Sequence, residues 1–175
     1  FKCWSHQCGY WDIVKAIGIT DEPVPAPQFT KAVETHEVKR YVLTMPSGDV
    51  VEHVRYESDD GQSKEFKWFC NGEIGLKGIK VADLPLYNVD AIEPNKPVVV
   101  VEGEKACDAL ASTGLIATVA TVGGANVAPS EESLRPLLQA SEIFLWPDAD
   151  TQGRNHMADL KKKFLVVGHR KVSYI

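Results

Sequence analysis

Two stretches of the sequence decide the fold: KPVVVVEGEKACD at Lys96–Asp108 and SEIFLWPDADTQGR at Ser141–Arg154. In each stretch, a short run of β-branched or aromatic residues is followed directly by carboxylates. Short apolar runs of this kind are typical of buried strands in a parallel sheet. The sequence therefore predicts two buried strands that deliver acidic side chains to the edge of a sheet.

The residues around these stretches predict an alternation of strands and helices. After Glu102, apolar residues recur at helical spacing as far as Leu115, so Glu102 falls where a strand turns into a helix. Residues 116–122 form another β-branched run, and residues 130–140 a helix with a serine at its start. Residues 172–175 are expected to be a last strand. This order predicts an α/β fold with a parallel sheet and right-handed crossovers.

The order of the strands decides whether the acids meet. With the order 2-1-3, the first and third strands are neighbours, and Glu102 lies beside Asp148 and Asp150 at their carboxyl ends. Open α/β sheets bind ligands in the crevice at such a point, where the connections leave in opposite directions.

The charge of these three acids predicts a divalent cation. Carboxylates about 4 to 5 Å apart repel each other by about 4 kcal/mol per pair at an effective dielectric constant of about 20. Oxygen-only ligands favour Mg²⁺ or Mn²⁺, which indicates phosphoryl or nucleotidyl transfer. An alternative needs no metal: an Asp-x-Asp after a strand is often only a turn, with Asp150 or Thr151 capping the next helix.

Several residues beside the acids are candidates for substrate contacts. Lys105 and Arg154 each stand near the start of a predicted helix, where a phosphate is favoured, and His156 is a weaker candidate. Gly103 and Gly153 are expected to contact the substrate as well. The loop of Gly123, Gly124 and Asn126 on the same edge would permit close approach to the backbone, or is an ordinary turn. Solvated side chains are the alternative for the two basic residues.

Three motifs together resemble the Toprim domain of primases, topoisomerases, OLD-family nucleases and recombination-mediator proteins. They are VVVVEGEK, VGGAN and WPDADTQGR, and the resemblance runs from about residue 96 to residue 175. The form EGEK-x-x-DAL with D-x-D-x-x-GR, together with GLKGIKVADLPLYN upstream, is similar to DnaG-like primases and primase-helicases of phages and plasmids. The resemblance implies a Rossmann-like fold with a parallel four-stranded sheet between helices, preceded by a small antiparallel β-rich lobe.

The resemblance also implies roles for residues. Glu102 would be the general acid/base and a metal ligand, while Asp148 and Asp150 would hold Mg²⁺. Many primases carry a further aspartate where this chain has Ala106, so Asp108 is considered as a possible metal ligand instead.

The implied activity is Mg²⁺- or Mn²⁺-dependent synthesis of short RNA primers on single-stranded DNA during replication. Its partners would be the DNA template, nucleoside triphosphates and a replicative helicase. A Toprim nuclease and a non-catalytic module that binds DNA or a partner are the alternatives.

Composition adds general limits. The chain has 175 residues, of which 44% are hydrophobic, so it can form a real core. No apolar run approaches twenty residues, so we expect a cytoplasmic protein without a membrane segment. The net charge of −5 is not typical of a nucleic-acid binder, although local basic contacts remain compatible with it.

Residues 1–20 and 21–37 are expected to precede the globular part. In residues 1–20, Cys3 and Cys8 resemble half of a primase zinc ribbon, but Zn²⁺ needs four ligands and the second pair is missing. Two reduced thiols are the alternative. Residues 21–37 are rich in proline and are interpreted as a linker.

Residues 38–95 are expected to form the β-rich lobe. Alternating runs at 39–45 and 50–56 flank the turn PSGD, and residues 65–69 predict a third strand. The lobe mixes basic and aromatic residues, which indicate either a surface for single-stranded template or a solvated sheet face: Arg40, Arg55, Lys64, Lys67, Lys77, Lys80, Tyr41, Tyr56, Phe66 and Trp68.

Overall fold

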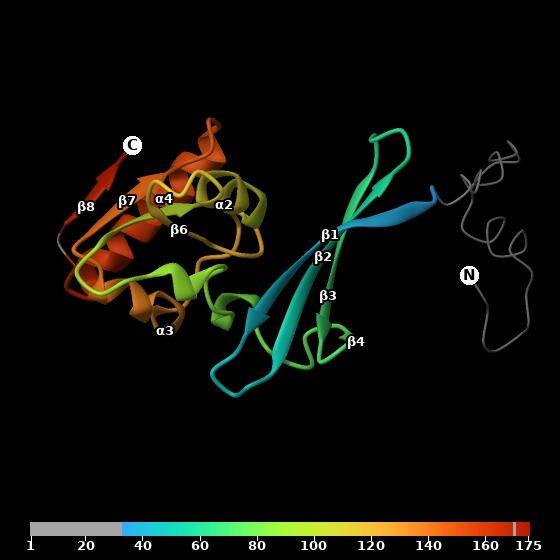
Figure 1. Cartoon of the computed structure of the whole chain (residues 1–175), viewed down its shortest axis with the longest axis horizontal. Coiled ribbons are helices and arrows are strands. Elements are labelled where there is room, and N and C mark those ends of the chain that lie inside the picture. The colour runs from blue at the N-terminus through green and yellow to red at the C-terminus, as the bar shows by residue number, and fades with distance from the viewer. Residues whose placement is uncertain (1–32, 170) are drawn as a thin grey trace, which may run out of the picture. The chain divides into compact units, whose positions relative to one another are not determined.

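The computed structural model describes residues 33–169 and 171–175 (Figure 1). The zinc-ribbon remnant with Cys3 and Cys8, and the linker as far as residue 32, lie outside the described residues. Residues 34–175 form one unit that contains two four-stranded sheets.

The first sheet is antiparallel and has the order β1-β2-β3-β4. Its strands are β1 (Thr35–Thr44), β2 (Val50–Ser58), β3 (Lys64–Cys70) and β4 (Glu73–Ile74). This confirms the predicted hairpin and third strand. The first strand begins inside the segment predicted to be linker, because Thr35 still pairs with Ser58 at the far end of β2.

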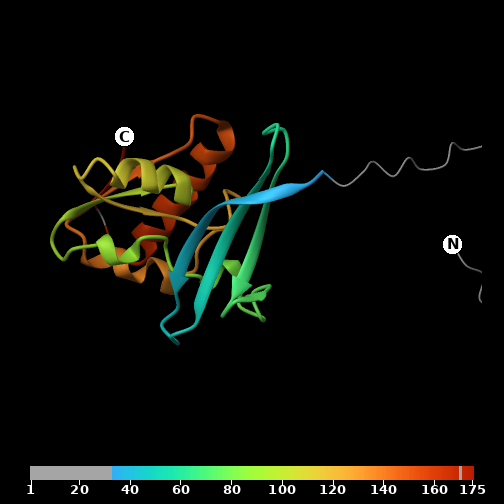
Figure 2. The same ribbon diagram turned by 45° about the vertical axis from the view of Figure 1, so that its right-hand side comes forward.

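The connection from residue 75 to residue 96, green in Figure 2, leads from the antiparallel sheet to the parallel one. It contains two short 3-10 turns, η1 (Val81–Asp83) and η2 (Val89–Ala91). Leu84 and Leu86 between these turns are 1% and 2% exposed, so the leucine-proline-leucine motif anchors the connection in the core.

The second sheet is parallel and has the order β6-β5-β7-β8. Its strands are β5 (Pro97–Val101), β6 (Ala117–Ala120), β7 (Glu142–Trp146) and β8 (Val172–Tyr174). The helical segments are α2 (Glu104–Ala111), α3 (Glu131–Leu134), η3 (Arg135–Gln139) and α4 (Thr151–Val166). The predicted α/β fold, the 2-1-3 order of the first three strands and the final strand are therefore confirmed.

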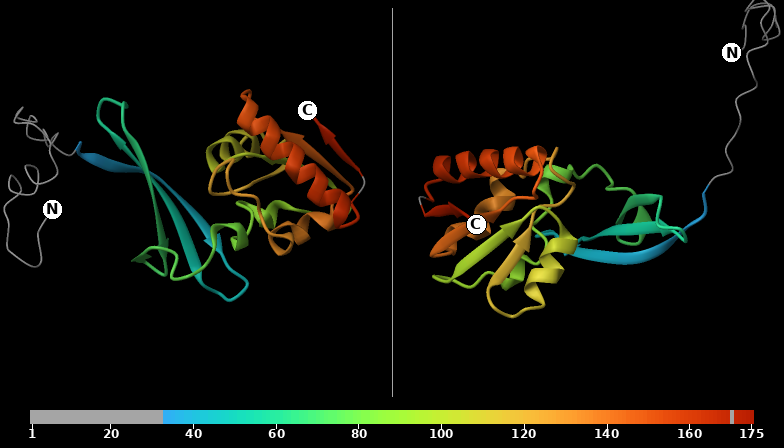
Figure 3. Two further views of the ribbon diagram at one scale, coloured as in Figure 1. Left: turned by 180° about the vertical axis from the view of Figure 1, so that it is seen from behind. Right: turned by 90° about the horizontal axis from the view of Figure 1, so that it is seen from above.

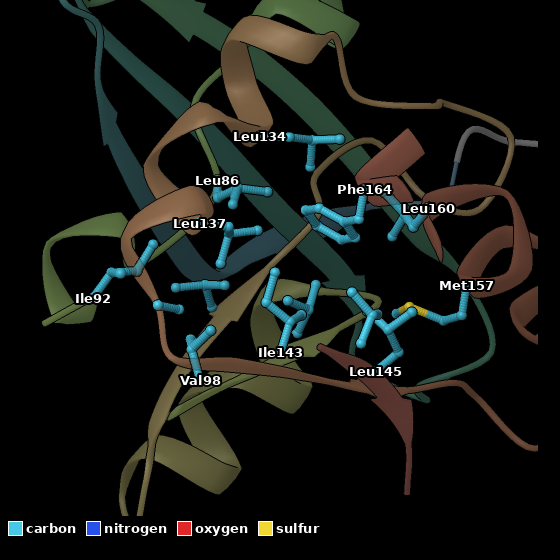
Figure 4. Packing of buried hydrophobic residues seen from close by; sticks show 14 residues of the cluster. Leu86, Ile92, Val98, Leu134, Leu137, Ile143, Leu145, Met157, Leu160 and Phe164 are labelled. Atoms are coloured by element: carbon cyan, nitrogen blue, oxygen red, sulfur yellow. The ribbon is translucent and has the colours of Figure 1, made fainter. Parts of the chain in front are cut away.

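Helices cover both faces of the parallel sheet, as the right panel of Figure 3 shows for α4 and α2. On one face, Val98 and Val100 pack with α3, η3 and α4 around Phe164 in the largest cluster of the core (Figure 4). On the other face, Val99 and Val101 pack with α2 around Cys107. Because β5 has helices on both sides, all four of its valines are buried.

A third apolar cluster joins the two sheets. Leu43, Val51 and Cys70 of the antiparallel sheet pack against Leu84 and Val122. Cys70 and Cys107 are buried free thiols, and each packs in an apolar cluster. Among the described residues, no helix has the length and apolar character needed to cross a membrane.

Candidate active site

The register of the parallel sheet brings the acidic stretches together. Val101 pairs with Trp146, so β5 and β7 end at the same level as neighbouring strands. Glu102 follows Val101 directly, and Pro147 separates Trp146 from Asp148. The carboxyl ends of these two strands form the crevice in which open α/β sheets bind ligands.

The packing around Gly153 shows how closely Glu102 and Asp148 approach each other. Gly153 is buried in the first turn of α4. A Cβ atom at this position would lie 2.6 Å from Oε2 of Glu102 and 2.9 Å from both the Cβ and the backbone nitrogen of Asp148. The two acids therefore lie against the same point of α4, and only a glycine leaves room for both.

Glu102 is in an environment that disfavours its charge. Its Oε2 is buried and has no hydrogen-bond partner in the part of the chain that the structure describes. Burial raises the pKa of Glu102, and the negative charges of Asp148 and Asp150 raise it further. A buried carboxylate oxygen without a partner is costly, so this site favours a proton or a cation.

The donor set fits Mg²⁺ or Mn²⁺, since all three side chains offer carboxylate oxygens. Within the described residues, no three His, Cys, Asp or Glu side chains are placed to hold a metal ion by themselves. Mg²⁺ is commonly held by one or two carboxylates, with waters and substrate phosphates as its other ligands. Glu102 and Asp148, which approach the same point of α4, are the pair that could hold it, and Asp150 as a further ligand stays a prediction.

Asp150 has a structural role as well. Its Oδ1 accepts a hydrogen bond of 2.7 Å from the backbone N–H of Gly153 and caps α4. The capping interpretation of Asp150 is therefore confirmed. It does not exclude a metal role, because a carboxylate has several acceptor positions and the cap uses one of its two oxygens.

Arg154 lies above the loop that carries the aspartates. Its Nη1 donates to the carbonyl oxygen of Ala149 at 2.8 Å, and its Nη2 donates to Oγ1 of Thr151 at 3.2 Å. The side chain is otherwise exposed. A guanidinium held in this way keeps further N–H groups for a phosphate.

Lys105 lies at a groove of about 270 Å³ between α2 and the antiparallel sheet, which Lys39 and Arg55 also line. Arg55 in addition lies over the ring of Phe66, which is 43% exposed. Two acids, Glu57 and Asp108, line the same groove and form ion pairs with Arg55 and Lys39. Basic residues elsewhere in the lobe are ion-paired as well: Arg40, Lys67 and Lys77. The groove therefore combines basic and acidic side chains beside an exposed aromatic ring.

A buried contact between the two sheets was not predicted from the sequence. Nδ1 of His53, on β2, lies 2.6 Å from Oε1 of Glu104, the first residue of α2. The His53 ring stacks on Trp68, with 3.9 Å between ring centroids and 9° between planes. This pair ties the antiparallel sheet to the turn that carries Glu102. The inward position of His53 in the alternating pattern of β2 is the only sequence signal for it.

His156 was predicted from the sequence as a weaker candidate for a phosphate contact, but its side chain is not placed to make one. The ring is buried, its Nδ1 donates to the carbonyl oxygen of Ala125 at 3.1 Å, and its Nε2 lies 3.1 Å from Oγ1 of Thr121. Burial lowers the pKa of His156, which keeps the ring neutral. The residue fastens the loop after β6 to α4.

Asp108 has other partners than a metal. Its Oδ1 accepts a hydrogen bond of 2.8 Å from the hydroxyl of Tyr87, and its Oδ2 lies 2.9 Å from Nζ of Lys39. These contacts give no support to Asp108 as a metal ligand, which stays a prediction.

A larger cavity of about 660 Å³ is at another place, between the turn after β1 and the segments α3 and η3. It is lined mainly by apolar side chains and shares no residue with the acidic site. We assign the candidate site by its chemistry and not by its size.

An open parallel sheet with acids at the carboxyl ends of two neighbouring strands defines a Rossmann-like α/β domain with an acidic ligand site. Residues 97–175 match the family model of the Toprim domain. This part of the chain is a Toprim domain. A comparison with curated protein sequences gives no significant match.

Solved structures of primases have a similar fold over both sheets. A primase domain from Pseudomonas aeruginosa superposes with a TM-score of 0.55 at 22% identity, covering 78% of this chain and 42% of that one. The E. coli primase catalytic core gives 0.56 at 19% identity, covering 77% and 42%. The primase fragment of the bacteriophage T7 primase-helicase protein gives 0.51 at 18% identity, covering 77% and 56%. This chain thus spans about half or less of those chains, and the likeness establishes the fold.

Proposed function

We propose that this chain is part of a DNA primase, a Mg²⁺-dependent nucleotidyltransferase that makes short RNA primers on single-stranded DNA. The observation that carries the proposal is the meeting of Glu102 and Asp148 at Gly153, where a buried oxygen of Glu102 has no hydrogen-bond partner among residues 33–169 and 171–175. The likeness of the fold to primase catalytic cores supports this reaction class over other metal-dependent phosphoryl transfers.

In this proposal Glu102, Asp148 and Asp150 hold Mg²⁺ or Mn²⁺. When bound, the ion neutralises charge on the phosphates and lowers the pKa of an attacking hydroxyl group. Glu102 would also be the general base that takes the proton of the primer 3′-hydroxyl. The 3′-oxygen then forms a bond to the α-phosphorus of the nucleotide, and pyrophosphate leaves with the electrons of the broken P–O bond.

Basic side chains and the backbone orient the triphosphate. Arg154 and Lys105 supply donors at the starts of α4 and α2, and the N-terminal end of α4 favours negative charge. Gly103, where a Cβ atom would meet nothing within 4 Å, leaves space for the phosphates to approach the backbone, whereas the space at Gly153 is taken by Glu102 and Asp148.

The partners follow from the groove beside α2. Lys105 at this groove, with Phe66 beside Arg55, offers basic and aromatic chemistry of the kind that binds single-stranded DNA, while Lys39 and Arg55 would have to exchange their ion pairs with Asp108 and Glu57 for phosphates. A replicative helicase is the proposed protein partner, because one structure of the same fold comes from a primase-helicase protein of a phage. We propose that primer synthesis takes place at the replication fork in the cytoplasm. Binding of Zn²⁺ by Cys3 and Cys8 also stays a proposal.

Primer synthesis tests the proposal directly. Purified chain is incubated with single-stranded DNA, radiolabelled ribonucleotides and Mg²⁺, beside a plasmid-nicking assay and an Asp148→Asn control. We expect short RNA products from the wild type and none from the variant. Nicked plasmid without RNA would replace the proposal by a Toprim nuclease.

A non-catalytic module that binds DNA or a partner is favoured by one observation, which is Ala106 at a position where many primases carry an aspartate. DNA binding without RNA synthesis or nicking, in the presence of Mn²⁺, would establish this second candidate.

A further inference from the structure

A small apolar groove opens next to the acids, on the opposite side of α2 from the groove of Lys105 and Arg55. Its volume is about 270 Å³. One wall comes from α2 and the other from the ends of β5 and β7, and the residues that matter here are Ala106, Ala109, Leu110, Val101, Trp146 and Asp148.

The groove exists because of the side chains on its two walls. The α2 helix packs over β5 and β6 and presents the small residues Ala106 and Ala109 toward the end of β7. Trp146, the last residue of β7, forms the other wall and is 48% exposed. An indole half exposed beside a groove of small apolar side chains is a typical surface for a flat aromatic ligand.

The groove is continuous with the acidic site. Asp148 lines the groove and also lies at the point of α4 that Glu102 approaches. Val101, which lines the groove, directly precedes Glu102. If a ligand binds with its phosphates at the acids, the group attached to its sugar can therefore reach the groove.

We propose that this groove binds the base of the nucleoside triphosphate, which stacks on Trp146 while its phosphates lie at Glu102 and Asp148. The inference rests on the proposed function and adds the subsite for the base. Beyond Asp148, the polar side-chain groups of the groove are the indole N–H of Trp146 and the Thr113 hydroxyl, which donates to the carbonyl oxygen of Leu110. Stacking without hydrogen-bond readout accepts every base, as a polymerase needs when pairing with the template selects the nucleotide.

The test observes Trp146 itself. The chain contains four tryptophans. The protein is labelled with 5-fluorotryptophan, and the ¹⁹F resonance of Trp146 is assigned by its loss in Trp146→Phe. ATP and inorganic tripolyphosphate, each with Mg²⁺, are titrated separately. We expect ATP, but not tripolyphosphate, to shift the Trp146 resonance, whereas Trp68, which is stacked on His53, serves as an internal control.

Affinity gives a second readout. Base stacking on an aromatic side chain predicts that ATP binds roughly tenfold more tightly than tripolyphosphate. Ala109→Leu fills the groove and should remove this advantage while the affinity for tripolyphosphate stays the same. The matched control, Ala111→Leu, adds the same side chain to α2 outside the groove and should change neither affinity.

The outcomes separate this inference from the proposed function. Equal affinities for ATP and tripolyphosphate, with an unmoved Trp146 resonance, would overturn the base subsite and leave the acidic site intact. CTP and ATP should give similar shifts, and a response to one base alone would contradict recognition by stacking. If neither ATP nor tripolyphosphate binds with Mg²⁺, the proposed function and the inference both fail.

Discussion

Replacement of Gly153 by alanine tests the convergence of the acids at α4. In an exposed helix, alanine is more stable than glycine by about 0.5–1 kcal/mol. At Gly153 the new Cβ would lie 2.6 Å from Oε2 of Glu102 and 2.9 Å from the backbone nitrogen of Asp148. The backbone cannot yield cheaply, so Glu102 must turn away and the start of α4 must shift. We expect the free energy of unfolding to fall by about 1–3 kcal/mol, as in other overpacked sites.

The assay combines urea unfolding with Mn²⁺ titration followed by calorimetry. Gly153→Ala should lower both the stability and the affinity for Mn²⁺, because displacement of Glu102 separates it from Asp148. Gly103→Ala is the matched control, since Gly103 has an extended backbone with φ −167° and a Cβ there would meet nothing within 4 Å. A Gly153→Ala variant as stable as the wild type, with unchanged Mn²⁺ affinity, would refute the reasoning.

Three further predictions follow from the same geometry. Asp148→Asn should abolish Mn²⁺ binding and leave the melting temperature unchanged or slightly higher, because it relieves repulsion between like charges. Calorimetry measures both the Mn²⁺ affinity and the melting temperature. Marked destabilisation would instead indicate that Asp148 belongs to a structural turn. The pKa of Glu102 is raised, so the protonated side chain favours the folded state, and this contribution to stability is lost as the pH rises through the raised pKa. In urea titrations without metal, the free energy of unfolding of the wild type should therefore fall relative to that of Glu102→Gln as the pH rises through this range. Equal dependence on pH in the two proteins would contradict the burial of the Glu102 charge. Glu104→Ala should weaken Mn²⁺ binding several-fold by releasing the contact with His53, whereas Glu104→Gln, which can keep the hydrogen bond, and the control Tyr87→Phe should not. Equal Mn²⁺ affinity in Glu104→Ala would show that this contact only stabilises the fold.

The central part of the fold could be predicted because its signals are local. The run of four valines before Glu102 and the apolar run before Pro147 each specify a buried strand and its end. One topological rule then places the two ends side by side. The approach of Glu102 to Asp148 follows from these two steps, without any knowledge of the side-chain packing.

The contacts between the two sheets could not be predicted in this way. His53 and Glu104 are 51 positions apart, and nothing in the local sequence of either residue names its partner. Asp108 looked like a free acid near Glu102, but the partners that engage it, Tyr87 and Lys39, come from other parts of the chain. The burial of His156 likewise depends on the loop after β6, which sequence periodicity does not place.

The central claim is that Glu102, Asp148 and Asp150 share one divalent cation. Crystals soaked with Mn²⁺ and a nucleoside triphosphate, measured at the manganese absorption edge, test it most directly. The expected result is an anomalous peak within coordination distance of carboxylate oxygens of Glu102, Asp148 and Asp150, next to the triphosphate. Anomalous density at any other place, with these carboxylates left without metal, would contradict it.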